Sequence, residues 1–143
     1  MGNPPGPDFE LLEHTADLGI LVRGDSPERL FENAAGALIQ IMVRGNPRSS
    51  PAKSRLEVEG SDLEDLMVRW LGEILYLFEG EGKVLLRATT RVDSPHRLRA
   101  TLETVSFDPR DYEILNEIKA VTYHQIEVKE KAGHWEARII FDV

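Results

Sequence analysis

The first and last apolar runs of the chain have the short period that is typical of strands. Residues 9–12 and 18–22 are two brief apolar stretches, separated by a polar bend that contains Asp17. The run at 135–143 alternates with a period of two, which places Asp142 on the face that points away from the core. Both ends of the chain are therefore predicted to form strands.

Two longer segments have the spacing of amphipathic helices. Ser26 followed by Pro27 is a typical helix start, and the Gly-Asn-Pro sequence at 45–47 is a typical end. Residues 61–64 fit a capping box for the second helix, and the two glycines within 80–82 end it. The apolar stripes predicted to face the core are Leu30, Phe31, Ala34, Ala35, Leu38, Ile41 and Met42 in the first helix and Leu63, Met67, Trp70, Leu71, Ile74, Leu75 and Phe78 in the second.

The remainder of the chain predicts strands and turns. Residues 84–92 and 98–105 are two strand-like runs joined by a turn, which favours a hairpin. Residues 106–115 have weak periodicity and predict an irregular surface connection. Two further strands are expected, at 54–59 and 117–128.

Composition narrows the class of protein. The chain has 143 residues, 41% of them hydrophobic, which is enough for one domain with its own core. Seventeen basic against 25 acidic residues give a formal charge of −8, so the chain repels nucleic-acid phosphates on average, although a local basic patch is compatible with this charge. The absence of cysteine excludes disulfides, thiolate nucleophiles and cysteine-bound zinc.

The first residues carry no targeting pattern. Residues 1–7 have neither a basic start nor an apolar core, and no later segment is long enough to span a membrane. We therefore expect a flexible tail at 1–8, one domain at 9–143, no membrane association and a cytoplasmic location.

Carboxylates near the two predicted terminal strands are candidates for a metal site. Asp142 and the α-carboxylate of Val143 repel each other unless water or a cation separates them. A third carboxylate from Asp17 would complete an all-oxygen pocket for Ca²⁺, Mg²⁺ or Mn²⁺. The alternatives are a solvated aspartate at a strand end, and a polar bend whose side chains bond only to local backbone amides.

Other polar residues give weaker signals. The four histidines lack the close helical pairing of a zinc site, so each is expected to be structural. Lys119 lies beside apolar residues just inside the strand predicted at 117–128, and it is either a contact for a phosphate or partner carboxylate or a solvated lysine. The histidines are His14, His96, His124 and His134.

Four ordered blocks of sequence, which together cover most of the chain from residue 9, resemble the signature blocks of the archease family. The blocks are Glu13-His14-Thr15-Ala16-Asp17-Leu18-Gly19-Ile20, Leu30-Phe31-Glu32-Asn33-Ala34-Ala35, Ile118-Lys119-Ala120-Val121-Thr122-Tyr123-His124 and Trp135-Glu136-Ala137-Arg138-Ile139-Ile140-Phe141-Asp142-Val143. The resemblance implies an accessory protein without catalytic residues of its own, which activates RtcB-type RNA ligases in tRNA splicing and RNA repair. Such ligases join RNA ends with GTP and Mn²⁺ through a guanylylated histidine, and the accessory protein promotes guanylylation and multiple turnover.

The resemblance also implies a fold and site residues. It implies an α+β fold, a single compact domain with two helices packed on a mixed or antiparallel sheet. The family's divalent-metal ligands fall on Asp17, Asp142 and Val143, with Ca²⁺ expected first and Mg²⁺ or Mn²⁺ as alternatives, and its functional lysine falls on Lys119. RNA is expected to be involved only indirectly, through the ligase. The chain departs from the family pattern at 104–105, Thr-Val in place of Gly-Glu, and at Tyr112, in place of a histidine.

Two other classes of function stay open on the residues alone. One is a stand-alone metal-dependent phosphoesterase or nuclease that uses the same carboxylates, for which Lys119 and Arg138 are the candidates to stabilise phosphate charge. The other is a chaperone-like module with no metal role. An assay with broken tRNA halves, with and without ligase, distinguishes an activator from an enzyme.

Overall fold

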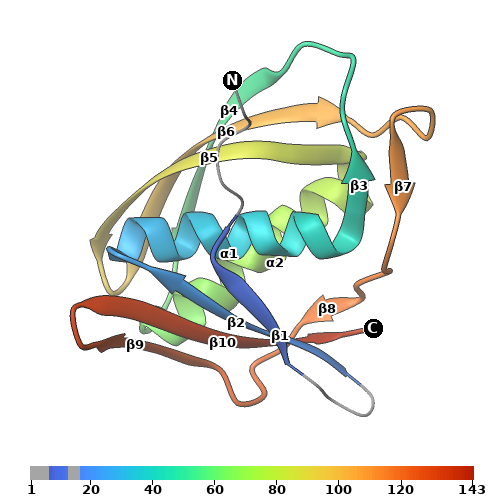
Figure 1. Cartoon of the computed structure of the whole chain (residues 1–143). Coiled ribbons are helices and arrows are strands. Elements are labelled where there is room, and N and C mark those ends of the chain that lie inside the picture. Colours follow the sequence, from blue (N-terminus) through green and yellow to red (C-terminus); the bar gives the residue numbers. More distant parts are fainter. Residues whose placement is uncertain (1–6, 13–16) are drawn as a thin grey trace.

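The computed structural model describes residues 7–12 and 17–143, in which two helices lie between two antiparallel sheets (Figure 1). Most of the tail predicted at 1–8 is outside the described residues. The elements in chain order are β1 (Phe9–Leu12), β2 (Asp17–Gly24), α1 (Pro27–Met42), β3 (Val43–Gly45), β4 (Ala52–Glu59), α2 (Leu63–Glu81), β5 (Lys83–Ser94), β6 (Arg97–Ser106), β7 (Tyr112–Ile114), β8 (Ala120–Val121), β9 (Glu127–Lys131) and β10 (His134–Asp142).

All strand pairs are antiparallel. In the first sheet β1 pairs with β2 and β2 with β10, while β8 and β9 both pair with β10. In the second sheet β6 lies between β4 and β5, and β3 and β7 form a separate two-stranded ribbon. The predicted fold class, two helices packed on antiparallel sheet in an α+β domain, is confirmed.

Both helices begin at side chains that satisfy free backbone amides. The Ser26 side chain accepts a hydrogen bond from the Arg29 amide, and Pro27 follows as predicted. For α2 the cap is Asp62 rather than the predicted Ser61, because the Asp62 carboxylate accepts from the Asp65 amide at 2.8 Å. Gly82 ends α2 in the left-handed conformation, with φ of 63°.

The end of α1 and the segment after β6 differ from the prediction. Helix α1 ends at Met42 rather than at 45–47, because Val43 is already extended and begins β3. The segment at 106–115, predicted to be irregular, contains β7, whose residue Ile114 pairs with Val43. Three-residue strands show little periodicity, so the sequence did not indicate this pairing.

The single strand predicted at 117–128 is also wrong. Only the two residues of β8 and the start of β9 are extended, and a turn separates them. Gln125 lies in this turn with φ of 52°, a conformation that no strand residue adopts. The chain therefore reaches β10 twice, first through β8 near the end of β10 and then through β9 near its start.

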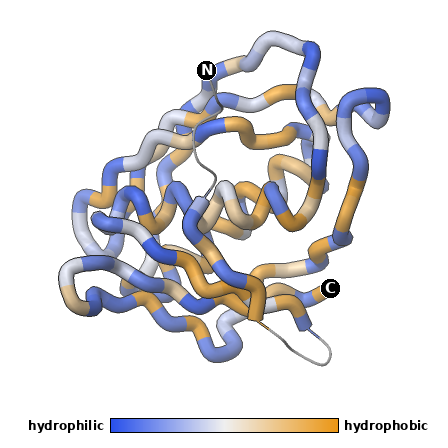
Figure 2. Tube along the Cα trace, in the orientation of Figure 1, coloured by the Kyte–Doolittle hydropathy of each residue, from blue (hydrophilic) through white to orange (hydrophobic). Residues whose placement is uncertain are grey.

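The core lies between the two sheets and around both helices. Figure 2 shows apolar and polar positions alternating along α1, whose apolar stripe is buried as predicted. Trp70 of α2 is fully buried, and its indole Nε1 donates to the Phe31 carbonyl at 2.9 Å, which joins the two helices. Across the described residues, neither helix is long and apolar enough to cross a membrane.

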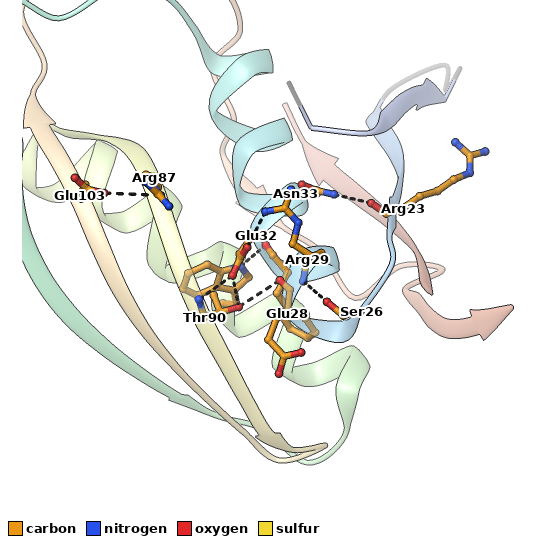
Figure 3. Close-up of polar contacts among 11 residues, drawn as sticks. Arg23, Ser26, Glu28, Arg29, Glu32, Asn33, Arg87, Thr90 and Glu103 are labelled. Atoms are coloured by element: carbon orange, nitrogen blue, oxygen red, sulfur yellow. Dashed lines mark hydrogen bonds and ion pairs between the residues drawn. The ribbon is translucent and has the colours of Figure 1, made fainter. Parts of the chain in front are cut away.

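Polar side chains of α1 connect this helix to both sheets (Figure 3). The Glu32 carboxylate accepts from the backbone amide and the hydroxyl of Thr90 in β5, at 2.9 and 3.0 Å. On the other side Asn33 donates to the carbonyl of Arg23 in β2 at 2.8 Å. Adjacent residues of one helix thus fix its position between the sheets.

Candidate functional site

Asp17 and Asp142 lie directly opposite each other in the ladder between β2 and β10. Asp17 is the first residue of β2 and Asp142 is the last of β10. Residues paired in this way point to the same face of the sheet, with Cβ atoms about 4.5–5.5 Å apart. The register therefore brings together two carboxylates that are 125 positions apart in the printed sequence.

The two carboxylates are on the face of the sheet opposite to the core. One position further along the ladder, Phe141 pairs with Leu18 and with Val121, and Phe141 is fully buried. Because side chains alternate along a strand, the Asp17 and Asp142 side chains point the other way. The expectation that Asp142 points away from the core agrees with this register.

Lys119 lies on the other side of Asp142. Its backbone amide donates to the Asp142 carbonyl at 2.7 Å, and the next residue, Ala120, pairs with Asp142. The preceding residue, Ile118, is 1% exposed, whereas Lys119 is exposed and its ammonium forms no ion pair with any described residue. The buried isoleucine anchors the segment while the lysine faces solvent.

Four candidate residues are thus gathered at one corner of the first sheet, where Figure 1 also places the C-terminal end of the chain. We call Asp17, Asp142, Val143 and Lys119 the carboxylate corner. Val143 follows Asp142 directly and is 42% exposed. His14, which belongs to the same sequence block as Asp17, is outside the described residues.

The donor chemistry of this corner fits a hard divalent cation. Two carboxylates held side by side repel each other, and a cation between them would remove that repulsion. Carboxylate oxygens are the ligands that Ca²⁺, Mg²⁺ and Mn²⁺ prefer. Residues 7–12 and 17–143 contain no group of three or more His, Cys, Asp or Glu side chains placed to hold a metal.

The segment after Lys119 is held to helix α2 by a contact that the sequence did not predict. The Tyr123 hydroxyl donates to Asp65 Oδ1 at 2.6 Å, and Arg69 Nε donates to the same carboxylate at 3.0 Å. These bonds, with that from Tyr123 as the largest cause, lower the pKa of Asp65 from 3.8 to about 2, and the same bond raises the pKa of Tyr123. Asp65 and Tyr123 are 58 positions apart, and no local pattern connects them.

Closer to the corner, Thr122 continues the attachment to β10. Its amide and its hydroxyl both donate to the Ile140 carbonyl, at 3.0 and 2.8 Å. The segment that carries Lys119 is therefore fixed at Ile118 by burial, at Thr122 by β10 and at Tyr123 by α2. The backbone at Lys119 therefore has a defined position relative to Asp142.

The described histidines and the residues that depart from the family pattern have the surroundings of structural residues. His96 Nδ1 lies 3.3 Å from the Gly60 carbonyl, His134 Nε2 lies 3.2 Å from Glu136, and His124 is exposed in a turn. Thr104, Val105 and Tyr112 are buried, and the Tyr112 ring stacks on Phe107 with centroids 6.1 Å apart. These replacements therefore contribute to packing.

The fold and the corner define a small α+β protein in which two helices lie between antiparallel sheets and two acidic strand ends meet. The model of the archease protein family (MTH1598/TM1083) matches residues 9–143. The chain belongs to the archease family.

Known relatives are similar over nearly the whole chain. The chain is 34% identical to the protein archease of Methanosarcina mazei, covering 96% of this chain and 97% of that protein. It is 36% identical to the protein archease of Pyrococcus furiosus, covering 94% and 98%.

Two solved structures have the same fold. The solution structure of Methanobacterium thermoautotrophicum protein 1598 matches with a TM-score of 0.76 at 27% identity, over 94% of this chain and 98% of that one. The crystal structure of an archease from Thermotoga maritima, described as a possible chaperone, matches with a TM-score of 0.65 at 22% identity, over 100% and 98%.

Proposed function

We propose that this archease is an accessory protein that activates an RtcB-type RNA ligase in tRNA splicing and RNA repair. In this role it promotes GTP-dependent guanylylation of the ligase and repeated turnover. Family membership over residues 9–143 supports the proposal. The observation that carries it is the ladder register, which pairs Asp17 with Asp142 beside the Lys119 amide, so that three of the four family blocks meet at one corner.

The carboxylates of the corner would hold a divalent cation. Asp17 and Asp142 would supply two oxygen ligands, and the α-carboxylate of Val143 would supply a third. Ca²⁺ is the first choice, because it accepts irregular sets of oxygen ligands more readily than Mg²⁺ does. When bound, the ion supplies positive charge at the edge of a chain whose formal charge is −8.

Lys119 would act on the partner or on its nucleotide. Its exposed ammonium, next to the carboxylate corner, can contact a phosphate or a carboxylate of the ligase complex. The contacts of Ile118, Thr122 and Tyr123 hold the backbone on both sides of it. This arrangement gives the lysine a fixed place in an interface without requiring it for folding.

The joining of broken tRNA halves tests this proposal and its alternatives. Ligase alone, this protein alone and the two together are compared under multiple-turnover conditions with GTP and Mn²⁺. An activator increases product only when ligase is present. Hydrolysis of the terminal phosphate or cleavage of the halves by this protein alone would establish a stand-alone phosphoesterase or nuclease instead, and no effect in either arm would leave the chaperone-like role.

In the same assay, Lys119→Glu is expected to remove most of the activation with little change in melting temperature. Lys119→Arg should restore it only in part, because a forked guanidinium differs from a compact ammonium. Lys83→Glu is the matched control, since Lys83 is exposed at the α2–β5 junction. Equal losses for the variants at 119 and 83, or a large fall in melting temperature for Lys119→Glu, would contradict the assignment.

A further inference from the structure

The outer face of the second sheet concentrates positive charge in a chain that is acidic overall. Strand register places one set of side chains from β4, β5 and β6 on the face away from the helices, because the alternate set, including Val58, Leu98 and Leu102, is buried. We call this set the arginine face. Its residues are Lys53, Arg55, Glu57, Glu59, Arg87, Thr89, Arg91, Arg97, Arg99, Thr101 and Glu103.

This face is cationic because its acids do not match its bases. It holds six of the 17 basic residues of the chain but only three of the 25 acidic ones, with Asp93 at its margin as a fourth. Arg97 pairs with Glu57 at 2.7 Å, and Arg99 pairs with Asp93 at 2.8 Å. Within the described part of the chain, Lys53, Arg55 and Arg91 form no ion pair, so their charge is available to a ligand.

The free arginines border a hollow at the centre of the face. An open depression of about 680 Å³ is lined by Arg55, Arg91, Arg99 and the two threonines Thr89 and Thr101, among others. Thr89 and Arg55 both pair with Thr101 across the sheet, so two hydroxyls and a guanidinium form one row. This set of donors is the one that proteins use for phosphate and ribose oxygens.

The next row contains an unfavourable pair that an anion would relieve. Arg91 is directly opposite Arg99 in the ladder between β5 and β6. Like charges in this position destabilise a sheet. Asp93 forms its hydrogen bonds with Arg99, and Glu57 is opposite Arg99 on the other side, so Arg91 is the member of the pair without a bonded carboxylate among the described residues. A phosphate above the pair would turn this repulsion into attraction.

We infer that the arginine face binds the phosphate backbone of base-paired RNA. None of its outward positions, all of which are described, is aromatic, so bases have no side chain on which to stack and single strands are not favoured. RNA duplexes are recognised through phosphates and 2′-hydroxyls rather than through bases. Cationic side chains on neighbouring strands are about 5 Å apart, and those along one strand are about 7 Å apart. Together they can reach several phosphates of such a backbone.

The inference goes beyond the proposed function, because ligase activation does not require this protein to touch RNA. Direct contact with a tRNA stem would bring the activator and the RNA ends to the ligase together. The carboxylate corner is on the first sheet and the arginine face on the second, so the two can be tested separately. Neither ligase nor divalent cation is needed in the binding assay.

Fluorescence anisotropy with a labelled RNA hairpin whose stem has about 16 base pairs measures this binding. The full chain is compared with the double variant Arg55→Gln, Arg91→Gln at about 50 and 200 mM salt. The control is Arg44→Gln, Arg110→Gln, which removes the same charge from exposed arginines elsewhere. Thermal melting checks that every variant is folded.

We expect salt-dependent binding by the full chain and by the control, and binding at least about tenfold weaker for the double variant at the lower salt concentration. Each lost cation should reduce the slope of log affinity against log salt by about 1. A single strand of equal length should bind more weakly than the hairpin.

No binding by the full chain at the lower salt concentration, or equal weakening in the control, would overturn the inference. If the double variant keeps RNA binding but loses binding to purified ligase, the face serves an acidic protein surface and the RNA assignment is wrong. Failure of the RNA assay leaves the joining assay with tRNA halves unaffected, so the two proposals can fail separately.

Discussion

At the scale of single residues, the hydrogen bond from Tyr123 to Asp65 determines the ionisation of a carboxylate. The pKa of Asp65 is lowered to about 2, with this bond as the largest cause. A carboxyl whose pKa is lower in the folded state stabilises the protein above its unfolded pKa, near 4, and this contribution is lost as the pH falls from about 4 to about 2. The attachment of the Lys119 segment to α2 is therefore expected to weaken in this acidic range.

Tyr123→Phe should raise the pKa of Asp65 toward its ordinary value, because Arg69 and the Ser61 amide remain but the main donor is lost. An NMR titration of the side-chain carboxyl carbons measures this. Tyr76→Phe is the control, since Tyr76 is exposed on the same helix and its ring lies near Gly80. An unchanged Asp65 pKa in Tyr123→Phe would mean that the hydroxyl does not bind Asp65 in solution.

At the scale of elements, Gly72 in the interior of α2 and Gly82, the residue that caps its C-terminal end, differ in backbone conformation. An added Cβ would meet no atom within 4 Å at either Gly72 or Gly82. Gly82, however, has φ of 63°, a left-handed backbone conformation that is strained for residues with a side chain. Gly72 has no positive φ and lies in the middle of the helix. The same substitution should therefore have opposite effects at the two positions.

Gly72→Ala should increase the free energy of unfolding by about 1 kcal/mol, because alanine favours the helix interior. Gly82→Ala should decrease it by about 1 kcal/mol, because the left-handed end of the helix becomes strained. Urea unfolding curves of the two variants and the unchanged chain provide the comparison. A loss of stability in Gly72→Ala would contradict the open surroundings of this glycine.

The elements also show how much of the fold could be predicted from the sequence. The apolar stripes of α1 and α2 and the C-terminal strand β10 are long and periodic, and they lie close to their predicted places. The ribbon of β3 with β7 and the division between β8 and β9 were missed because elements of two or three residues carry no period. Their pairing depends on residues far away in the chain.

The residues of the candidate site were likewise predictable only in part. Asp17, Asp142 and Lys119 were candidates from the sequence, first on their residue chemistry and then through the family blocks, and the structure adds the register that brings them together. Asp65 and Tyr123 could not be found, because their contact depends on the docking of a turn against a helix. The sequence contains a pattern that indicates the arginine face, because Arg55, Arg91 and Arg99 alternate with core positions along their strands. Only the register, however, shows that these strands are neighbours.

At the scale of the whole molecule, charge and chemistry are divided between the two sheets. The first sheet presents the two aspartates and Lys119 at one corner, and the second presents the arginine face. The helices lie between the sheets, and polar residues of α1 such as Glu32 and Asn33 fix it to both (Figure 3). The surface proposed for the ligase and the surface proposed for RNA can therefore coexist on one small domain.

The number of ligation turnovers per ligase with the double variant Asp17→Asn, Asp142→Asn tests whether the carboxylate corner is needed for activation. Both side chains lie at strand ends on the face away from the core, so the variant should fold normally, as circular dichroism can verify. Glu130→Gln, an exposed carboxylate of β9 in the same sheet, is the control. We expect the double variant to leave the ligase at its unassisted turnover while the control activates fully; full activation by the folded double variant would show that the two aspartates are not needed.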